Sequence, residues 1–240
     1  CDVLVVGGGP AGSTIAAVLA QRGRDVVVLE KAQHPRFHIG ESLLPANLPL
    51  FQRMGLAEDV RRIGLFKPGA EFVSDHYQKS NLFFFATASH LIASHSYHVR
   101  RATFDQLLFE NCRRHRARTF ENTRVTEVSF PAGERATVSA RGADGATSVW
   151  RPRFVVDATG RDTLLAGQLG LKMANKRNNT AAIFGHFSGV PRRPGAAEGV
   201  ITIHLVADGW FWMIPLPDGL MSVGLVGGPD LFKKRGGGIE

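Results

Sequence analysis

Asp2-Val-Leu-Val-Val-Gly-Gly-Gly-Pro-Ala-Gly-Ser13, continued by Asp25-Val-Val-Val-Leu-Glu30, is the stretch that decides the fold. Its pattern predicts a strand, a glycine turn, a helix of small residues and a second strand that ends in an acid. Gly7 permits the tight turn, Gly9 lets the backbone approach a pyrophosphate, and Gly12 lets helix and sheet pack closely. The turn therefore predicts a dinucleotide whose phosphates lie at a helix N-terminus, where free N–H groups and the helix dipole favour negative charge.

The residues around this turn complete the pattern. Pro10 and Ala11 open the predicted helix, and Glu30 follows the second strand at close to the spacing at which an acid accepts hydrogen bonds from a ribose. A glycine turn alone arises by chance. Here the flanking strand, helix, second strand and acid are all present, as a dinucleotide-binding fingerprint requires.

Length and composition restrict the class of protein. The chain has 240 residues, of which 44% are hydrophobic, enough for one large domain or two closely packed ones. Two cysteines, Cys1 and Cys112, predict neither a disulfide framework nor a metal site, and they favour a reducing cytoplasm. The first apolar run is too short for a membrane span and leads into glycines, which predicts neither signal peptide nor anchor. The missing initial Met indicates a processed, trimmed or partial sequence.

The net charge of +8 and the isoelectric point near 10.1 raise the question of an acidic partner. The densest basic run, residues 113–118, follows an amphipathic stretch, where cations stabilise the C-terminus of a helix. No aromatic residues alternate with this run, as a nucleic-acid groove would require. We therefore predict no nucleic-acid partner, while an acidic carrier protein that presents the substrate stays open.

Polar and charged residues gather in the loop His34-Pro-Arg-Phe-His-Ile-Gly-Glu-Ser-Leu-Leu-Pro45, between two apolar elements. Loops on a rigid scaffold often carry sites, which makes Arg36, Glu41 and Ser42 candidates. The alternative is an ordinary surface loop that ends at a helix start, because Ser42 and Pro45 suit the first turn of a helix.

The remaining pattern alternates between helical and strand segments. Helices are predicted at 45–54, at 57–63 and from Arg100 toward the basic run. Strands are predicted at 71–78, 81–86, 97–99, 124–130, 136–140, 148–150, 153–157, 181–190, 200–206, 210–216 and 220–227. The strand that ends in Asp157 reads as buried and parallel, whereas the last four read as a second sheet.

This order of elements is unlike that of a plain nicotinamide dehydrogenase and resembles the FAD-binding fold of aromatic hydroxylases and their relatives. Gly7 to Gly12 with Glu30 match that family's ADP-binding motif. Arg101 with Phe104-Asp105 matches its helix near the flavin chain, and Asp157-Ala-Thr-Gly-Arg161 resembles the motif that touches the middle of the cofactor.

The resemblance implies an α/β fold in which a Rossmann-like FAD-binding domain is interrupted by a mostly antiparallel substrate sheet. The FAD-binding domain is expected at residues 1–66 and 100–172. The substrate domain is expected at residues 67–99 and 173–240, with its C-terminal part missing.

Two stretches are similar to those of one branch of this superfamily, the flavin-dependent halogenases. Trp210-Phe-Trp-Met-Ile-Pro215 fits the signature W-x-W-x-I-P, and Phe37-His-Ile-Gly-Glu-Ser-Leu-Leu-Pro45 is similar to the loop under the flavin. A purely structural alternative exists, because Trp210, Trp212 and Ile214 would alternate on one face of a buried strand.

The resemblance implies that reduced FAD, oxygen and a halide generate hypohalous acid, which a lysine receives or guides to the substrate. Trp210 and Trp212 would separate flavin from substrate. Lys67, in Phe66-Lys67-Pro-Gly, lies where the family places the lysine, and its amine suits the task if desolvation lowers its pKa. The alternative is an exposed lysine before a Pro-Gly turn.

The implied site contains catalytic Lys67, Trp210 and Trp212, and no metal. The cofactor contacts are expected from Gly7, Gly9, Pro10, Ala11, Gly12, Glu30, Lys31, Arg36, Glu41, Ser42, Arg101, Asp157 and Gly160. The substrate is expected to be an electron-rich aromatic ring or a group tethered to a carrier protein. A separate flavin reductase is expected because the sequence shows no nicotinamide-binding domain.

Members of the family continue beyond the equivalent of Gly228 with a Gly-Asp segment for the flavin and a halide-binding turn, which leaves FAD affinity and activity of these 240 residues open. Two other functions compete with halogenation. One is an FAD-dependent hydroxylase or isoprenoid-type reductase of the same fold. The other is a non-catalytic flavoprotein fragment.

Overall fold

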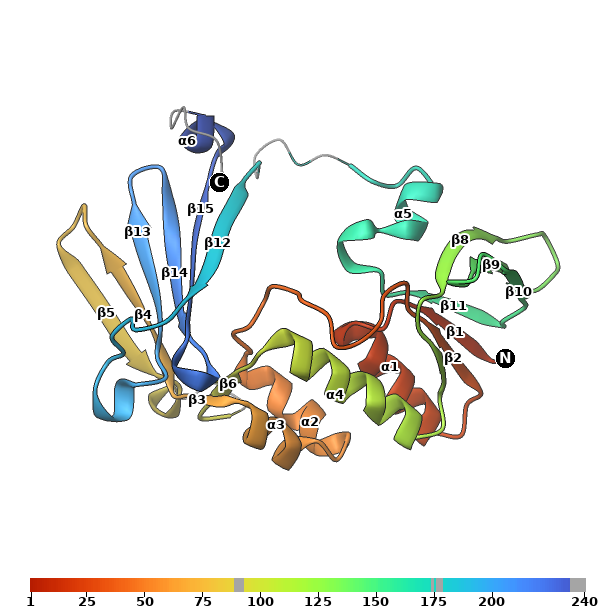
Figure 1. The fold of residues 1–240 in the computed structure, drawn as a ribbon, viewed down its shortest axis with the longest axis horizontal. Helices are drawn as coiled ribbons and strands as arrows, with labels where there is room; N and C mark the ends of the chain where they lie inside the picture. The colour runs from red at the N-terminus through yellow and green to blue at the C-terminus, as the bar shows by residue number, and fades with distance from the viewer. Residues whose placement is uncertain (89–92, 174, 176–178, 234–240) are drawn as a thin grey trace. The chain divides into compact units, whose positions relative to one another are not determined.

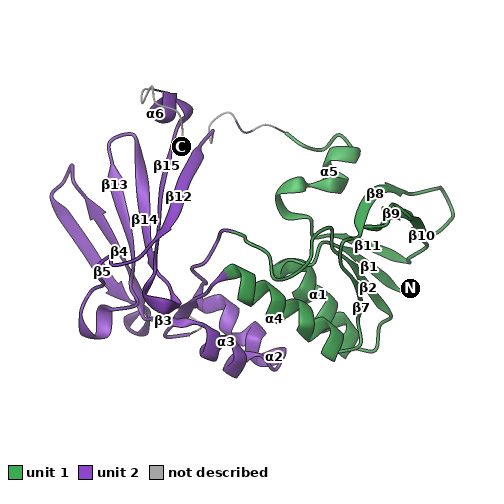
Figure 2. Cartoon of the chain, in the orientation of Figure 1, with its two compact units in different colours: residues 1–38, 101–173 green, residues 39–100, 174–240 purple. Residues whose placement is uncertain are grey.

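The computed structural model describes residues 1–88, 93–173, 175 and 179–233 (Figure 1). The chain forms two compact units, each assembled from two separate stretches (Figure 2). The first unit comprises Cys1–His38 and Arg101–Met173, and the second comprises Ile39–Arg100 and Ala174–Glu240. The predicted α/β class, with a first domain interrupted by a second body, is confirmed.

The first unit is built on a parallel sheet with the order β11-β1-β2-β7. Its strands are β1 (Val3–Val6), β2 (Val26–Leu29), β7 (Arg118–Phe120) and β11 (Phe154–Asp157). β1 and β2 are buried along their whole length. Unbroken runs of Val and Leu are what a strand covered on both faces requires.

An antiparallel sheet with the order β10-β9-β8 belongs to the same unit. It consists of β8 (Arg124–Ser129), β9 (Thr137–Arg141) and β10 (Thr147–Trp150). Leu4, Val6, Val27 and Leu29 share one buried cluster with residues of β8 and β9, so the two sheets have a common core. Full burial of each such side chain contributes roughly 1.5–3 kcal/mol.

Helices α1 (Pro10–Gln21) and α4 (Arg101–Arg114) pack against each other, with the Cys112 thiol donating to the Ser13 carbonyl at 3.1 Å. α1 has Pro10 in its first turn, where the missing N–H leaves no bond unmade, and it ends before Gly23, whose φ is +74°. The short elements η3 (Gly160–Asp162) and α5 (Leu164–Gln168) follow β11.

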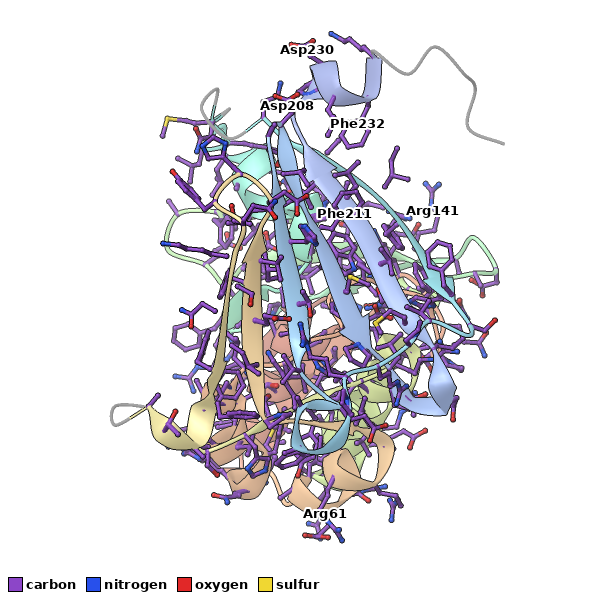
Figure 3. The ribbon with its side chains drawn as sticks, turned by 90° about the vertical axis from the view of Figure 1, so that its left-hand side faces the viewer. Arg61, Arg141, Asp208, Phe211, Asp230 and Phe232 are labelled. Carbon is purple, nitrogen blue, oxygen red and sulfur yellow. The ribbon has the colours of Figure 1, made fainter. Side chains whose placement is uncertain are left out.

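The second unit is built on a mostly antiparallel sheet with the order β12-β15-β14-β13-β4-β5, in which only β13 and β4 pair in parallel. Figure 3 shows this sheet with Phe211 on β14. The strands are β4 (Gly69–Ser74), β5 (Lys79–Phe84), β12 (Ala181–Phe187), β13 (Ile201–Val206), β14 (Gly209–Pro215) and β15 (Met221–Gly227). Ile201, Trp212, Ile214 and Leu216 form its buried cluster.

A smaller ladder in the second unit joins β3 (Leu65–Lys67) to β6 (Ser96–His98). Residues 41–43 pair with the other edge of β6, through Val99 N–H to Glu41 O at 2.9 Å and Leu43 N–H to Tyr97 O at 3.0 Å. The remaining elements are α2 (Leu48–Arg53), α3 (Ala57–Ile63), α6 (Pro229–Lys233), η1 (Pro45–Asn47), η2 (Phe85–Thr87), η4 (Gly195–Ala197) and η5 (Pro217–Gly219).

The unit boundaries lie after residues 38, 100 and 173, whereas the sequence places the domain boundaries after residues 66, 99 and 172. The first boundary differs because residues 41–43 pair with β6 and so tie the loop into the second unit. The functional labels of the two domains stay a prediction. Among the described residues, no helix has the length and apolar character that a membrane crossing needs.

Candidate functional site

A cavity of about 580 Å³ opens in the first unit, at the end of β1 where the glycine turn begins. The described residues that line it include nine of the predicted cofactor residues: Gly7, Gly9, Pro10, Ala11, Glu30, Lys31, Arg36, Arg101 and Gly160. Its volume falls within the range of small-molecule sites. The fingerprint and two segments far away in sequence therefore meet at one cavity.

The three fingerprint glycines differ in what surrounds them. A Cβ on Gly12 would lie 1.9 Å from the Gly7 carbonyl oxygen, and a Cβ on Gly7 would lie 2.5 Å from Ala158 O. At Gly9 the nearest atom to such a Cβ is Nη2 of Arg36, at 3.5 Å, so this position faces the cavity. Gly12 thus allows close packing, whereas the space beside Gly9 is open toward the cavity.

Glu30 holds the glycine turn against the end of β2. The carboxylate is almost fully buried and accepts the Gly8 N–H at 2.6 Å and the Ala32 N–H at 2.9 Å. Each oxygen keeps a further lone pair, which leaves room for a ribose hydroxyl. The role of Glu30 in ribose binding stays a prediction.

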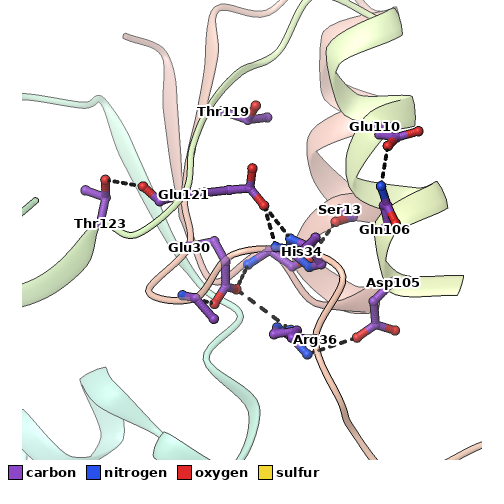
Figure 4. A network of polar contacts seen from close by, with 12 residues as sticks. Ser13, Glu30, His34, Arg36, Asp105, Gln106, Glu110, Thr119, Glu121 and Thr123 are labelled. Atoms are coloured by element: carbon purple, nitrogen blue, oxygen red, sulfur yellow. Dashed lines mark hydrogen bonds and ion pairs between the residues drawn. The ribbon is translucent and has the colours of Figure 1, made fainter. Parts of the chain in front are cut away.

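Arginines give the cavity a positive character. Arg36 lies between the carboxylates of Glu30, at 3.8 Å, and Asp105, at 3.2 Å (Figure 4). Arg101 bonds Asp105 at 2.8 Å. Burial, followed by the charges of Arg101 and Arg36, lowers the pKa of His38. A site that keeps its histidine neutral beside fixed arginines suits an anionic group such as a diphosphate.

Asp157 lies behind the cavity and stabilises its rim. The carboxylate accepts the Thr159 N–H at 3.0 Å, the Thr159 hydroxyl at 2.6 Å and the Leu165 N–H at 2.8 Å. These bonds, which outweigh the effect of burial, lower the pKa of Asp157. Asp157 therefore shapes the turn that leads to Gly160, and its predicted contact with the cofactor stays a prediction.

The sequence reasoning missed Thr123, Arg124, Val125 and Asp162 among the lining residues. His38, Thr159 and Arg161 also line the cavity; they lie in the two quoted stretches but were not named as site residues. Asp162 directly follows the second of these stretches, so proximity in sequence could have found it. Thr123 precedes β8 and Arg124 begins it, and no spacing rule connects that strand to the fingerprint. Lys31 pairs with Asp162 at the edge of this cavity.

The residues present fit the adenosine diphosphate part of FAD. The helix N-terminus of α1, with free N–H groups at Ala11 and Gly12, points at the cavity that Gly9 leaves open. Arg36 and Arg101 would supply cations for the diphosphate. Glu30 would supply an acceptor for the ribose.

Glu41 and Ser42 belong to the second unit. Glu41 is 1% exposed, and its Oε1 lies 2.8 Å from Nε2 of His186 on β12. Ser42 forms a bridge to His98 on β6. Their contact with the cofactor stays a prediction.

The amine of Lys67 is buried in the second unit. The side chain is 4% exposed, Nζ donates to the Leu43 carbonyl at 2.9 Å, and it lies 5.3 Å from the Phe85 ring centroid. Burial lowers the pKa of Lys67 to about 8. The alternative of an exposed lysine before a turn is wrong, because β3 ends at Lys67 and pairs it with Ser96 of β6.

Trp210 and Trp212 lie on one face of β14, as both of their sequence interpretations require. Trp212 is 9% exposed and donates its Nε1–H to Ser222 Oγ at 3.1 Å, whereas Trp210 is 36% exposed. Their ring centroids are 6.1 Å apart. Trp212 covers Gly224, where a Cβ would lie 2.1 Å from the indole. Trp212 is therefore part of the hydrophobic core as well as a candidate for the barrier between flavin and substrate. Trp210 is partly exposed at the surface of the unit.

A second cavity, of about 610 Å³, lies in the second unit and is lined by Leu65, Phe66, Pro68, Phe84 and residues of the 195–199 segment among others. The neighbours of Lys67 in the chain line it, and Lys67 itself does not. We therefore place no substrate there. Among the described residues, no cluster of His, Cys, Asp and Glu has the makeup of a metal site.

The buried amine makes a prediction about stability. The folded state disfavours the charged form of Lys67, so Lys67→Met should raise the free energy of unfolding at pH 7. The pKa falls from 10.5 to about 8, which corresponds to roughly 3 kcal/mol, less about 1 kcal/mol for the lost bond to Leu43. The gain in the free energy of unfolding is full below pH 8 and is lost as the pH rises to 10.5. Above that pH the folded and the unfolded wild type both hold a neutral amine, so burial no longer disfavours a charge.

Urea unfolding at pH 7 and pH 10 measures this gain. Lys79→Met, at an exposed lysine on β5, is the matched control and should change stability little. A Lys67→Met protein that is less stable than wild type at pH 7 would show that the buried charge is structural.

A family model described as FAD binding domain matches residues 1–215. The tryptophan 2-halogenase of Chondromyces crocatus is 36% identical over 97% of this chain and 44% of its own length. The 1H-pyrrole-2-carbonyl peptidyl-carrier-protein chlorinase of Pseudomonas fluorescens is 30% identical over 94% of this chain and 55% of its own.

Among solved structures, the myxobacterial chondrochloren halogenase, described as an FAD-dependent halogenase, superimposes with a TM-score of 0.91 at 35% identity, over 99% of this chain and 55% of its own. The chain spans about half the length of the relatives it matches. It belongs to the FAD-binding-domain family, and its predicted resemblance to flavin-dependent halogenases is confirmed.

Proposed function

We propose that the protein to which this chain belongs is a flavin-dependent halogenase that uses reduced FAD, oxygen and a halide to halogenate an electron-rich aromatic ring. The observation that carries the proposal is the buried amine of Lys67, with a pKa lowered to about 8. Burying an ammonium group costs free energy, and Lys67 has no carboxylate partner among the described residues to offset that cost. A role as a reactive amine would explain why the fold buries it.

The first unit is proposed to hold the cofactor. Gly9 and the α1 N-terminus would receive the diphosphate, Arg36 and Arg101 would neutralise it, and Glu30 would bind a ribose hydroxyl. Reduced FAD, together with oxygen and halide, supplies the oxidised halogen as hypohalous acid. A separate flavin reductase is proposed to deliver the reduced cofactor.

Lys67 is proposed to take up the oxidised halogen. Its neutral amine attacks the halogen of hypohalous acid, so that an N–halogen bond forms, the O–halogen bond breaks, and the amine proton leaves with the hydroxide as water. The aromatic ring then attacks the halogen, the nitrogen regains a proton, and the ring loses its proton to solvent or base. A pKa near 8 leaves a useful fraction of neutral amine near neutral pH, which an ordinary lysine does not.

The two tryptophans are proposed to keep flavin and substrate apart. Replacing Trp210 and Trp212 with alanine should abolish halogenated product and release peroxide while FAD stays bound. Truncation of the buried Trp212 should also destabilise the fold by roughly 3–5 kcal/mol, whereas the half-exposed Trp210 should matter less for stability. Product analysis of each single variant beside its melting curve measures both effects.

Trp210→Ala is the informative variant because its fold is expected to survive. Phe211→Ala, on the opposite face of β14, is a control for loss of an aromatic side chain on the same strand. A stable Trp210→Ala protein with wild-type halogenation would show that this indole has no part in the separation.

The substrate is proposed to be a small aromatic molecule or an aromatic acyl group tethered to a carrier protein. Support comes from relatives named for tryptophan and for a carrier-bound pyrrole. The test supplies the full-length protein with a flavin reductase and compares free aromatic compounds with the same groups on a carrier, with and without halide. A product that gains oxygen and ignores the halide would favour a hydroxylase.

A further inference from the structure

Three polar groups lie on the same face of the small ladder as Lys67. In this ladder β6 pairs Ser96 with Lys67 and His98 with Leu65, while Ser42 pairs with His98 from the other edge. Residues opposite each other, and residues two apart in one strand, point to the same face. Ser42, Ser96 and His98 therefore share the face from which the Lys67 side chain projects.

These groups are buried and have unused hydrogen-bonding capacity. Ser96 and His98 are fully buried, and the Oγ atoms of Ser42 and Ser96 and Nδ1 of His98 have no hydrogen-bond partner among the described residues. Leaving a buried polar atom unsatisfied costs about 1–3 kcal/mol. Three such atoms on one face indicate a ligand that satisfies them together.

The hydrogen bond of His98 determines which ligand this is. Nε2 lies 2.9 Å from the Gly199 carbonyl, which only accepts, so Nε2 carries the proton and Nδ1 is a bare acceptor. Burial above all, then the charge of Lys67 and more weakly that of Arg192, lowers the pKa of His98 to about 3, so the ring is neutral. Nδ1 thus needs a donor, and each serine hydroxyl can donate to one partner and accept from another.

Water is the ligand that matches this set. A buried water typically makes about three hydrogen bonds to otherwise unsatisfied groups. The Lys67 ammonium donates one N–H to Leu43, which leaves two N–H groups for further acceptors. Gly199 packs tightly against the ladder, because a Cβ there would lie 1.8 Å from the Phe66 carbonyl oxygen. The hydrogen bond from His98 to the Gly199 carbonyl therefore also holds the segment around Gly199 against the ladder.

We propose that Ser42, Ser96 and His98 form a buried water-binding site beside Lys67, and that His98 is a positioning residue for the Lys67 amine. The water donates to Nδ1 of His98 and accepts from the amine or a serine hydroxyl. It stabilises the ammonium form and holds the amine in one orientation. The inference rests on the proposed role of Lys67 for its meaning in catalysis, and its test does not depend on that role.

The test measures the pKa of Lys67 by NMR of the protein with ¹³C-labelled lysine, the resonance being assigned with Lys67→Arg. His98→Gln keeps an amide N–H for Gly199 and removes the acceptor at the Nδ1 position. It should lower the pKa of Lys67 by roughly half a unit to one unit, because the ammonium loses a hydrogen-bonded neighbour. His98→Asn keeps an acceptor at that position and should leave the pKa close to wild type.

Two results would overturn the proposal. If both variants leave the pKa of Lys67 unchanged, the site is not coupled to the amine. If His98→Asn lowers it as much as His98→Gln, an acceptor at the Nδ1 position does not preserve the pKa of Lys67, and that acceptor is not responsible for it. Amide spectra of both variants confirm that they are folded, and Ser96→Ala should produce a smaller shift in the same direction.

A high-resolution crystal structure of the protein provides the second measurement. It should show an ordered water within hydrogen-bond distance of Nδ1 of His98 and at least one of the two serine hydroxyls. Side chains that satisfy one another directly, with no water between them, would contradict the proposal. Neither measurement uses flavin or halide, so the proposed halogenase function can fail independently through an active Lys67→Ala protein.

Discussion

Replacement of Lys67 by alanine in the full-length protein is expected to remove halogenated product, with a loss of at least about a thousandfold in rate, of the size seen when a covalent group is deleted. FAD binding, oxygen consumption and peroxide formation should persist, because the cavity that fits the cofactor is lined entirely by residues of the first unit. Mass spectrometry of the product, beside flavin absorbance and a peroxide assay, measures these quantities.

Lys67→Arg separates charge from nucleophilicity. A guanidinium keeps the positive charge but stays protonated, so it cannot provide the neutral amine that an N–halogen bond requires. This variant should therefore be as inactive as Lys67→Ala. Lys79→Ala, which removes an exposed lysine of β5, is the matched control. Halogenation by Lys67→Ala at the wild-type rate would leave the residue without a catalytic task.

Gly9→Val is expected to abolish FAD retention and leave the fold intact. The φ of Gly9 is −74°, which valine tolerates, and a Cβ there meets only the flexible end of Arg36. Its methyl groups would occupy the space in which the backbone must approach the diphosphate. Flavin absorbance per protein should fall by more than tenfold, while the melting temperature changes little.

Gly12→Ala and Gly167→Ala are the two control variants for Gly9→Val. A Cβ on Gly12 would lie 1.9 Å from Gly7 O, so Gly12→Ala should destabilise the first unit itself. Gly167 has no atom near its Cβ position, and Gly167→Ala should retain both fold and flavin. Wild-type flavin content in Gly9→Val would remove the fingerprint from the cofactor site.

Much of the fold follows from local patterns that survive in the tertiary structure. The buried runs of β1 and β2, the glycine turn and the alternating strands of the second sheet were all predicted within a few residues. The three-residue strands β3 and β7 were missed, because their stability comes from pairing with β6 and β2 and not from their own composition.

The burial of Lys67 could not be predicted from the sequence, because it also depends on pairing with a distant strand. A lysine before Pro-Gly has the composition of an exposed turn. The pairing of β3 with β6 and the close packing of Gly199 against Phe66 bury it. Gly8 gives a second example. The fingerprint does not require a glycine at this position, yet a Cβ there would lie 2.5 Å from the Phe109 ring of α4. No spacing rule predicts this contact.

The measurement that tests the central claim most directly is the amount of oxidised halogen bound to Lys67. The full-length protein is given FAD, a flavin reductase, oxygen and bromide without any aromatic substrate, and its peptides are then analysed by mass spectrometry. The account predicts about one thiol-reversible bromine per protein on the peptide that contains Lys67, and none there in Lys67→Arg. Active oxidation of bromide with all of the oxidised halogen in solution, and none on Lys67, would contradict it.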